Sequence, residues 1–157
     1  MQKKDLVLQK LREILPEGAV TEDATYQSGC AFSAQVSTSG ILDAAAACDR
    51  VGFYLESVTG LDFVDTAEVV YHLNAYEPRS RFTLKVAIPH GEKIPSLSSI
   101  YASANWMERE VREFFGIQFT DHPDPRNLLL PEDADYCPLR KTFGKVSAYR
   151  KREEIYG

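Results

Sequence analysis

The sequence lacks the features of a membrane-spanning or exported protein. No run approaches the roughly 18 consecutive apolar residues that a transmembrane helix needs. The first 18 residues, MQKKDLVLQKLREILPEG, contain neither an uninterrupted apolar segment nor a small-residue cleavage site, so we interpret them as something other than a signal peptide. We therefore expect a cytosolic protein.

Cysteine is scarce, and its placement excludes common roles. Cys30, Cys48 and Cys137 lie far apart, and no CxxC motif occurs. An odd number at wide spacing disfavours a disulfide framework and also a zinc or iron–sulfur site. We expect unpaired thiols in a reducing compartment.

Motifs for nucleotide binding and hydrolysis are absent as well. The sequence contains no GxGxxG, GxxxxGK[ST], GxSxG, HxH or HExxH. These absences predict that the chain binds no cofactor and has no active site of its own. A pI near 5.2 and the lack of an RNP motif disfavour binding to nucleic acid. A stand-alone soluble enzyme and an RNA-binding module remain the alternatives from other functional classes.

Charge is present but unevenly distributed. Residues 105–135 carry three basic and eight acidic side chains, whereas residues 136–157 carry six basic and two acidic ones. A solvated surface is the plain explanation of any charged run. A reversal this large is more typical of a tail that docks on a charged surface.

Hydrophobic periodicity predicts a compact α+β domain over residues 1–120. Apolar residues at helical spacing predict helices over 5–15 and 97–115, and Ser39 is expected to cap a third helix that ends at Gly52. Alternating patterns predict strands near 30–36, 53–59, 68–75 and 82–88. We expect a four-stranded, mixed or mostly antiparallel sheet with helices on one face.

Prolines define the remainder of the chain. Pro123, Pro125, Pro131 and Pro138 exclude a continuous helix or a central strand. Residues 121–157 are therefore predicted to form an extended, proline-broken C-terminal tail.

The last predicted helix contains the best candidates for acid–base chemistry, yet their spacing argues against it. Glu108 and Glu110 diverge by about 200° on a helix. Glu110 and Glu113 are three residues apart and could be neighbours, but the adjacent Arg109 and Arg112 favour ionised carboxylates. The i, i+4 spacing predicts ion pairs of Glu108 with Arg112 and of Arg109 with Glu113. His122, in a His-Pro-Asp turn, is expected to cap a backbone group or a carboxylate.

One long, ordered motif spans the predicted helix and tail. Its residues are Glu108, Arg109, Glu110, Glu113, Phe114, Gly116, His122, Pro123, Asp124, Arg126, Pro131, Pro138, Leu139, Arg140 and Lys141. This string resembles the signature of the 30 kDa subunit, or C-type subunit, of respiratory complex I, the proton-translocating NADH:quinone oxidoreductase. The sequence departs from the usual pattern at Pro125, Asn127, Ala134, Tyr136, Thr142 and Gly144.

The resemblance implies a peripheral-arm subunit without a redox centre, which docks against the quinone-site (D-type) subunit and the iron–sulfur subunits. NADH, FMN, iron–sulfur clusters and quinone would then be bound by those partners. The complex would lie on the cytoplasmic, inner face of the cell membrane, and this chain would meet the membrane only through it. The equivalent subunit of a membrane-bound nickel–iron hydrogenase, formate hydrogenlyase or F420H2 dehydrogenase is the alternative. The signature residues are expected to contact a partner, to pin the tail to the last helix, or to do both.

Overall fold

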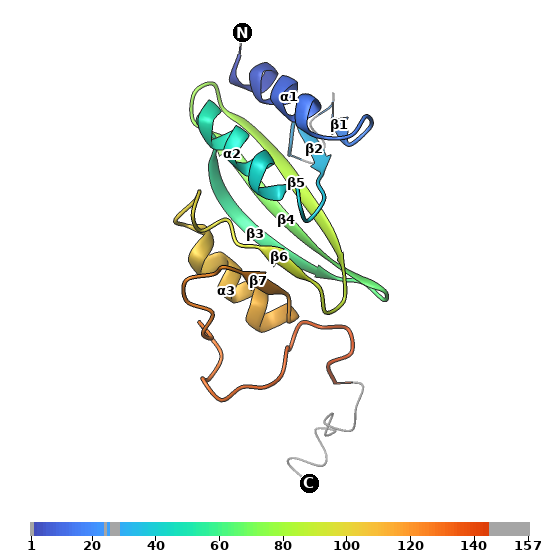
Figure 1. The fold of residues 1–157 in the computed structure, drawn as a ribbon, viewed down its shortest axis with the longest axis vertical. Helices are drawn as coiled ribbons and strands as arrows, with labels where there is room; N and C mark the ends of the chain where they lie inside the picture. The colour runs from blue at the N-terminus through green and yellow to red at the C-terminus, as the bar shows by residue number, and fades with distance from the viewer. Residues whose placement is uncertain (1, 24, 26–28, 145–157) are drawn as a thin grey trace.

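The computed structural model describes residues 2–23, 25 and 29–144. Its elements follow in the order α1 (Lys3–Ile14), β1 (Val20–Glu22), β2 (Phe32–Gln35), α2 (Ile41–Val51), β3 (Tyr54–Asp62), β4 (Thr66–Ala75), β5 (Ser80–Pro89), β6 (Lys93–Pro95), α3 (Ala104–Phe115) and β7 (Gln118–Thr120) (Figure 1). Within these residues, no helix is both long enough and apolar enough to cross a bilayer.

The main sheet is mixed and has the strand order β1-β2-β5-β4-β3. Strands β2 and β5 are parallel, and the other neighbouring pairs are antiparallel. The α+β class and the mixed sheet are confirmed, but the predicted number of four strands is wrong. Strand β1 adds a fifth strand at the edge, and its three residues are too few to show an alternating pattern. A second, two-stranded parallel sheet pairs β6 with β7.

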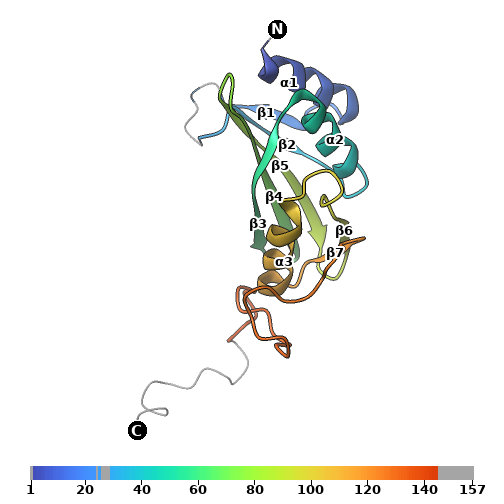
Figure 2. The same cartoon turned by 90° about the vertical axis from the view of Figure 1, so that its left-hand side faces the viewer.

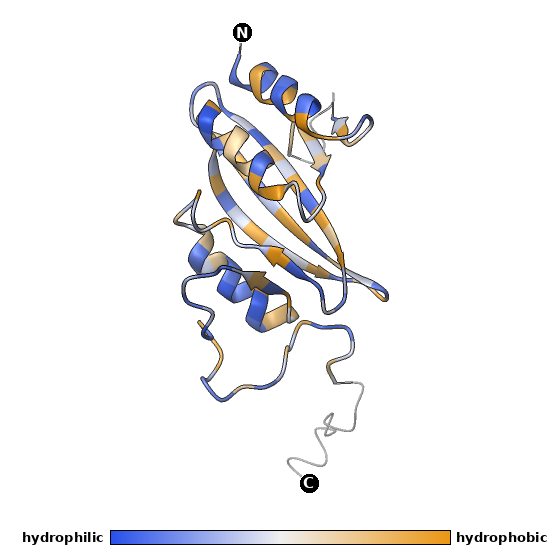
Figure 3. Ribbon diagram, in the orientation of Figure 1, coloured by the Kyte–Doolittle hydropathy of each residue, from blue (hydrophilic) through white to orange (hydrophobic). Residues whose placement is uncertain are grey.

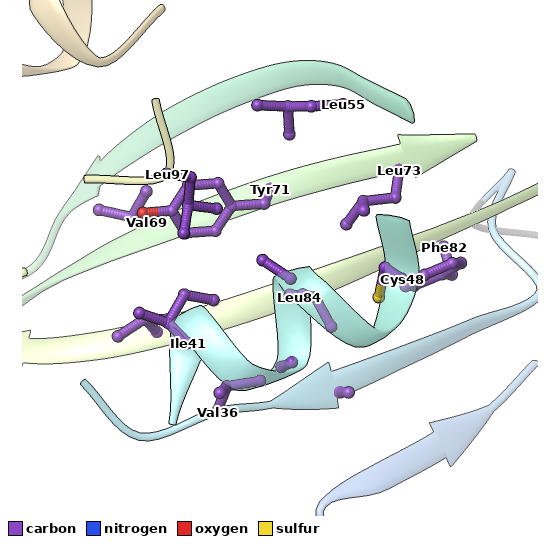
Figure 4. Close-up of a cluster of buried hydrophobic side chains, with 14 of the residues drawn as sticks. Val36, Ile41, Cys48, Leu55, Val69, Tyr71, Leu73, Phe82, Leu84 and Leu97 are labelled. Carbon is purple, nitrogen blue, oxygen red and sulfur yellow. The ribbon is translucent and has the colours of Figure 1, made fainter. Parts of the chain in front are cut away.

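The core lies between the main sheet and the helices. On β4, Val69, Tyr71 and Leu73 are buried, while Glu68 and His72 on the opposite face stay half-exposed. Hydrophobic and hydrophilic residues alternate along the long strands (Figure 3). Figure 4 shows Tyr71 and Leu73 grouped with Leu84 of β5 and with residues of α2. Each such side chain contributes about 1.5–3 kcal/mol by leaving water.

Helix α2 lies across one face of the sheet, and α1 packs against α2 (Figure 2). Gly52 ends α2 with a φ of 87°, the left-handed conformation that the sequence predicts there. The predicted capping role of Ser39 is wrong. The N-cap is Gly40, and its N–H is bonded to the Oγ of Ser37.

Helix α3 is shorter than predicted, because it begins at Ala104 rather than near residue 97. The preceding residues form turns in which the N–H groups of Ile100 and Tyr101 both donate to the Leu97 carbonyl. The Tyr101 hydroxyl reaches the carbonyls of Ala45 and Phe53, which ties this turn to the core. The turns therefore replace the first part of the predicted helix.

Helix α3 packs against β3 at a position that requires glycine. A Cβ atom on Gly60 would lie 2.5 Å from Cδ2 of Phe115, so the missing side chain lets the Phe115 ring contact the strand. Gly60 is paired with the buried Val69, which places α3 on the same face of the sheet as the rest of the core. The predicted placement of helices on one face is confirmed.

Candidate functional site

Residues 121–144, the described part of the predicted tail, form what we call the strap. The strap contains no helix or strand, and it runs from β7 back past α3 (Figures 1 and 2). Residues 145–157 of the predicted tail lie outside the described residues. Because the strap has no regular hydrogen-bond ladder, its backbone groups need other partners.

Glu113 accepts hydrogen bonds from three consecutive N–H groups in the middle of the strap. Its carboxylate accepts hydrogen bonds from the backbone N–H groups of Leu128 (2.9 Å), Leu129 (3.0 and 3.2 Å) and Leu130 (3.1 Å). Only 3% of Glu113 is exposed. The predicted ion pair of Glu113 with Arg109 is wrong, because the strap amides occupy both carboxylate oxygens.

Arg109 holds the strap one helical turn earlier, through carbonyl groups. Its Nε donates to the Arg126 carbonyl at 2.9 Å and its Nη2 to the Asn127 carbonyl at 2.8 Å. Its Nη1 also lies 3.5 Å from Asp124 Oδ2. Arg109 therefore binds two successive carbonyl groups of the strap. Glu113 binds the three N–H groups that follow them in the chain.

Asp124 and Arg126 form a two-bond pair on the strap. Arg126 donates from Nε and Nη2 to the two carboxylate oxygens, at 2.7 and 2.9 Å. These bonds, together with the charges of Arg126 and Arg109, hold the pKa of Asp124 well below its usual range. The pair lies next to the carbonyl that Arg109 binds, so it fixes the local course of the chain.

His122 caps a backbone group, as the His-Pro-Asp turn predicts. Its Nε2 lies 2.9 Å from the Asn105 carbonyl of α3, and its Nδ1 accepts the N–H of Asp124 at 3.0 Å. This pattern requires the neutral ring with its proton on Nε2. His122 thus ties the start of the strap to the first turn of α3.

Glu108 is fully buried and makes a different set of contacts from those predicted. Its carboxylate accepts the Ser96 hydroxyl at 2.6 Å and the Leu97 N–H at 2.7 Å, and Oε2 lies 3.8 Å from His122 Nε2. The predicted pairing with Arg112 is wrong, because the side chain points into the core toward the turn before α3.

Burial changes the protonation of Glu108. Desolvation raises its pKa to about 7, although the bonds from Ser96 and Leu97 act in the opposite direction. The Tyr71 hydroxyl has no partner among the described residues, and burial, followed by the Glu108 charge, raises its pKa well above the usual value. No local motif points to Ser96 or Tyr71, which lie far from Glu108 in sequence.

We predict that Glu108 makes the domain less stable as the pH rises. The folded state holds the Glu108 proton more tightly than the unfolded state, so this stabilisation is complete below pH 4.5 and is lost as the pH rises through 7. A shift from 4.5 to about 7 corresponds to about 3 kcal/mol. Urea unfolding at pH 5 and pH 8 should show this loss in the parent chain and a much smaller one in Glu108→Gln. Equal pH dependence in the two proteins would contradict the assignment.

The far end of the strap is fastened to α3 and to the end of β3. The Leu139 N–H donates to the Phe114 carbonyl at 3.0 Å, and the Lys141 N–H donates to Asp62 Oδ2 at 2.7 Å. The Lys141 ammonium lies 5.6 Å from the centre of the Phe63 ring. The strap is thus held at both ends and in its middle.

Other signature residues complete this arrangement. Gly116 ends α3 with a φ of 74°, and a Cβ there would lie 3.2 Å from Cys137 Sγ. The Pro131 carbonyl accepts bonds from Asn127 Nδ2 and the Ala134 N–H. Arg140 approaches His90 at 3.5 Å. Pro123 and Pro138 lie in the strap, and Glu110 is exposed on α3.

Four apolar side chains of the strap remain exposed: Leu129 (65%), Tyr136 (44%), Leu139 (55%) and Phe143 (50%). We call them the strap surface. Tyr136 and Phe143 stack on each other with ring centroids 5.8 Å apart. Among the described residues, no three histidine, cysteine, aspartate or glutamate side chains are grouped to hold a metal ion.

Comparison with known proteins gives consistent matches. The model of a family described as "Respiratory-chain NADH dehydrogenase, 30 Kd subunit" matches residues 34–149. The C-type subunit of NADH-quinone oxidoreductase from Roseiflexus sp. (strain RS-1) is 38% identical over 143 residues, 86% of this chain and 80% of that protein. The protein of the same name from Sinorhizobium medicae (strain WSM419) is 40% identical over 99 residues, 61% of this chain. The matched region covers 48% of the Sinorhizobium protein, about half its length.

A solved structure shares the fold. It is that of the membrane-bound sulfane sulfur reductase, described as an archaeal respiratory membrane complex. One of its chains matches with a TM-score of 0.75 at 22% identity, over 91% of this chain and 86% of that chain. At this identity, the likeness shows a common fold.

Proposed function

Because the chain belongs to the 30 kDa subunit family of respiratory-chain NADH dehydrogenase, we propose that it is a non-catalytic, peripheral-arm subunit of a proton-translocating NADH:quinone oxidoreductase. Its role is to dock through the strap against the quinone-site and iron–sulfur subunits and to hold them in fixed geometry. Electron transfer then takes place in those neighbours.

One observation carries this proposal: the strap is fixed from within while its apolar side chains face outward. Glu113 and Arg109 satisfy its N–H and carbonyl groups. Leu129 and Leu139 nevertheless remain more than half exposed. Apolar side chains held outward on an ordered segment are available to contact a partner. A strap ordered before binding loses less conformational entropy on docking.

The charged end of the strap indicates the chemistry of the partner. Lys141 and Arg140 lie beside the exposed Leu139 and Phe143. Aromatic and arginine side chains are enriched at protein interfaces. We expect an apolar partner surface with acidic groups at its edge, since complementary charges speed association and fix orientation.

The relatives bear on the kind of complex. Both relatives named above are C-type subunits of NADH-quinone oxidoreductase, which favours this complex over a hydrogenase, formate hydrogenlyase or F420H2 dehydrogenase. We propose further that NADH, FMN, iron–sulfur clusters and quinone are bound by the partners. The chain itself then lies on the cytoplasmic side of the membrane and contacts it only through the complex.

The test introduces charge into the strap surface. Leu139→Glu combined with Phe143→Glu should weaken binding to a peripheral-arm subcomplex that contains the quinone-site subunit by on the order of 30-fold or more, as expected when interface anchors are lost. The matched control is Ile14→Glu with Leu42→Glu, at two exposed apolar positions on α1 and α2. Affinity is measured from the binding of the purified subcomplex to the immobilised chain.

The two double variants distinguish a loss of docking from a general loss of solubility. Both variants should keep the melting temperature of the parent chain, because all four positions are exposed. Unchanged affinity in the strap variant, or an equal loss in the control, would contradict docking through the strap.

A further inference from the structure

A hollow lies between α3 and the first half of the strap. Its volume is about 490 Å³, and its lining residues are Arg112, Pro125, Arg126, Asn127, Glu132 and Ala134. The strap closes around it as a loop, which the bond from Asn127 Nδ2 to the Pro131 carbonyl (2.8 Å) holds in place. We call it the strap hollow.

Arg112 is the cation of this hollow whose hydrogen-bonding capacity is least used. A guanidinium group has five N–H donors. The bond found for Arg112 within the described residues runs from Nη1 to Asn127 Oδ1 at 3.3 Å. Its Nε is buried without an acceptor, and no carboxylate of the described residues lies within 4 Å of it. A buried charged donor left in this way destabilises the free chain.

The other arginines of the region already donate hydrogen bonds to groups of this chain. Arg109 donates to two carbonyls. Arg126 lines the hollow, but both of its bonds go to Asp124. Glu132 is exposed at the rim and acts electrostatically on Arg126. Arg112 therefore lines the hollow as a cation that has no carboxylate partner among the described residues.

We propose that the strap hollow receives an aspartate or glutamate side chain of the partner subunit, which pairs with Arg112. A carboxylate is the group that matches two guanidinium N–H donors at once. A volume of about 490 Å³ admits such a side chain together with part of its flanking chain. This proposal rests on the proposed function and adds to it the chemistry of one contact.

The first test removes the charge of Arg112. Arg112→Gln should weaken binding to the peripheral-arm subcomplex with the quinone-site subunit by on the order of 30-fold, because truncating one member of a buried charge pair costs about 2 kcal/mol or more. Arg50→Gln makes the same chemical change at an exposed position on α2, outside the signature, and should bind like the parent chain. The melting temperature of Arg112→Gln should stay close to the parent value, since the hydrogen bond from Arg112 to Asn127 is long.

The second test identifies the carboxylate. Arg112→Lys keeps the charge and adds an amine that a zero-length carbodiimide reagent joins to a carboxylate in salt-bridge contact. In the assembled subcomplex, mass spectrometry should find Lys at position 112 joined to an aspartate or glutamate of the partner. Reversing the charge of that partner residue should restore binding to Arg112→Glu.

The outcomes are distinct. If the parent chain fails to bind the subcomplex, the proposed function and this contact both fall. If the parent and Arg112→Gln bind equally, or the cross-link joins position 112 only to Glu132 of the same chain, the contact alone is refuted. Loss of binding in Arg112→Gln with a cross-link to the partner supports it.

Discussion

Val111→Asp will abolish the folded domain or lower its melting temperature by about 10 °C or more. Val111 is 3% exposed on the face of α3 that packs into the core. An aspartate there would bury a carboxylate without a cation, a change that typically costs about 4 kcal/mol or more. A loss of this size is a large part of the roughly 5–15 kcal/mol by which such a domain is stable. Circular dichroism during heating measures the effect.

The matched control lies about one and a half turns earlier on the same helix. Trp106 is 66% exposed, so Trp106→Asp should leave the melting temperature within a few degrees of the parent value. An unaltered melting curve for Val111→Asp would show that this face of α3 is not part of the core.

Glu113→Gln will free the middle of the strap while leaving the domain folded. The amide keeps one acceptor oxygen but loses the charge, and its NH₂ group faces the N–H groups of the strap. Hydrogen bonds to charged groups contribute about 1.5–3 kcal/mol each. We expect the amides of Leu128, Leu129 and Leu130 to exchange with solvent roughly 30-fold faster or more, which corresponds to about 2 kcal/mol.

Hydrogen exchange with site resolution is the measurement. Amides of β4 and β5 in the core should keep their protection, which distinguishes local release from unfolding. Glu110→Gln makes the same chemical change at an exposed position and should leave exchange in the strap unaltered. If the three strap amides exchange at parent rates in Glu113→Gln, the carboxylate is not what holds them.

The sequence could predict the elements whose periodicity reflects burial. Strands β4 and β5 alternate over most of their length, and the burial of Val111 on α3 follows from helical spacing. The strand order and the edge strand β1 could not be predicted, because pairing depends on long-range contacts that a three-residue segment does not reveal.

The charged residues of α3 show a second limit. Spacing along the helix predicts pairs within the helix, yet Glu113 is used by strap amides 15 to 17 residues later in the chain. Glu108 is likewise used by Ser96 and Leu97. Backbone N–H groups occur at every residue other than proline, so no sequence motif marks the ones that a buried carboxylate will bind.

The signature residues divide between the two roles expected of them. Arg109, Glu113 and His122 make contacts between α3 and the strap, which is the pinning role. The exposed Leu139, together with Lys141 and Arg140, remains available for the partner contact that we propose. Pinning and docking are therefore compatible, since the first gives the strap the fixed shape that the second requires.

The most direct test of docking through the strap is side-chain footprinting by hydroxyl radicals, with the chain free and with it assembled in the peripheral arm. We predict that Leu129, Tyr136, Leu139 and Phe143 become protected from oxidation on assembly, while the exposed Ile14 and Leu42 react as before. Oxidation of the four strap residues at the same rate in the free and assembled states would contradict the proposed role of the strap.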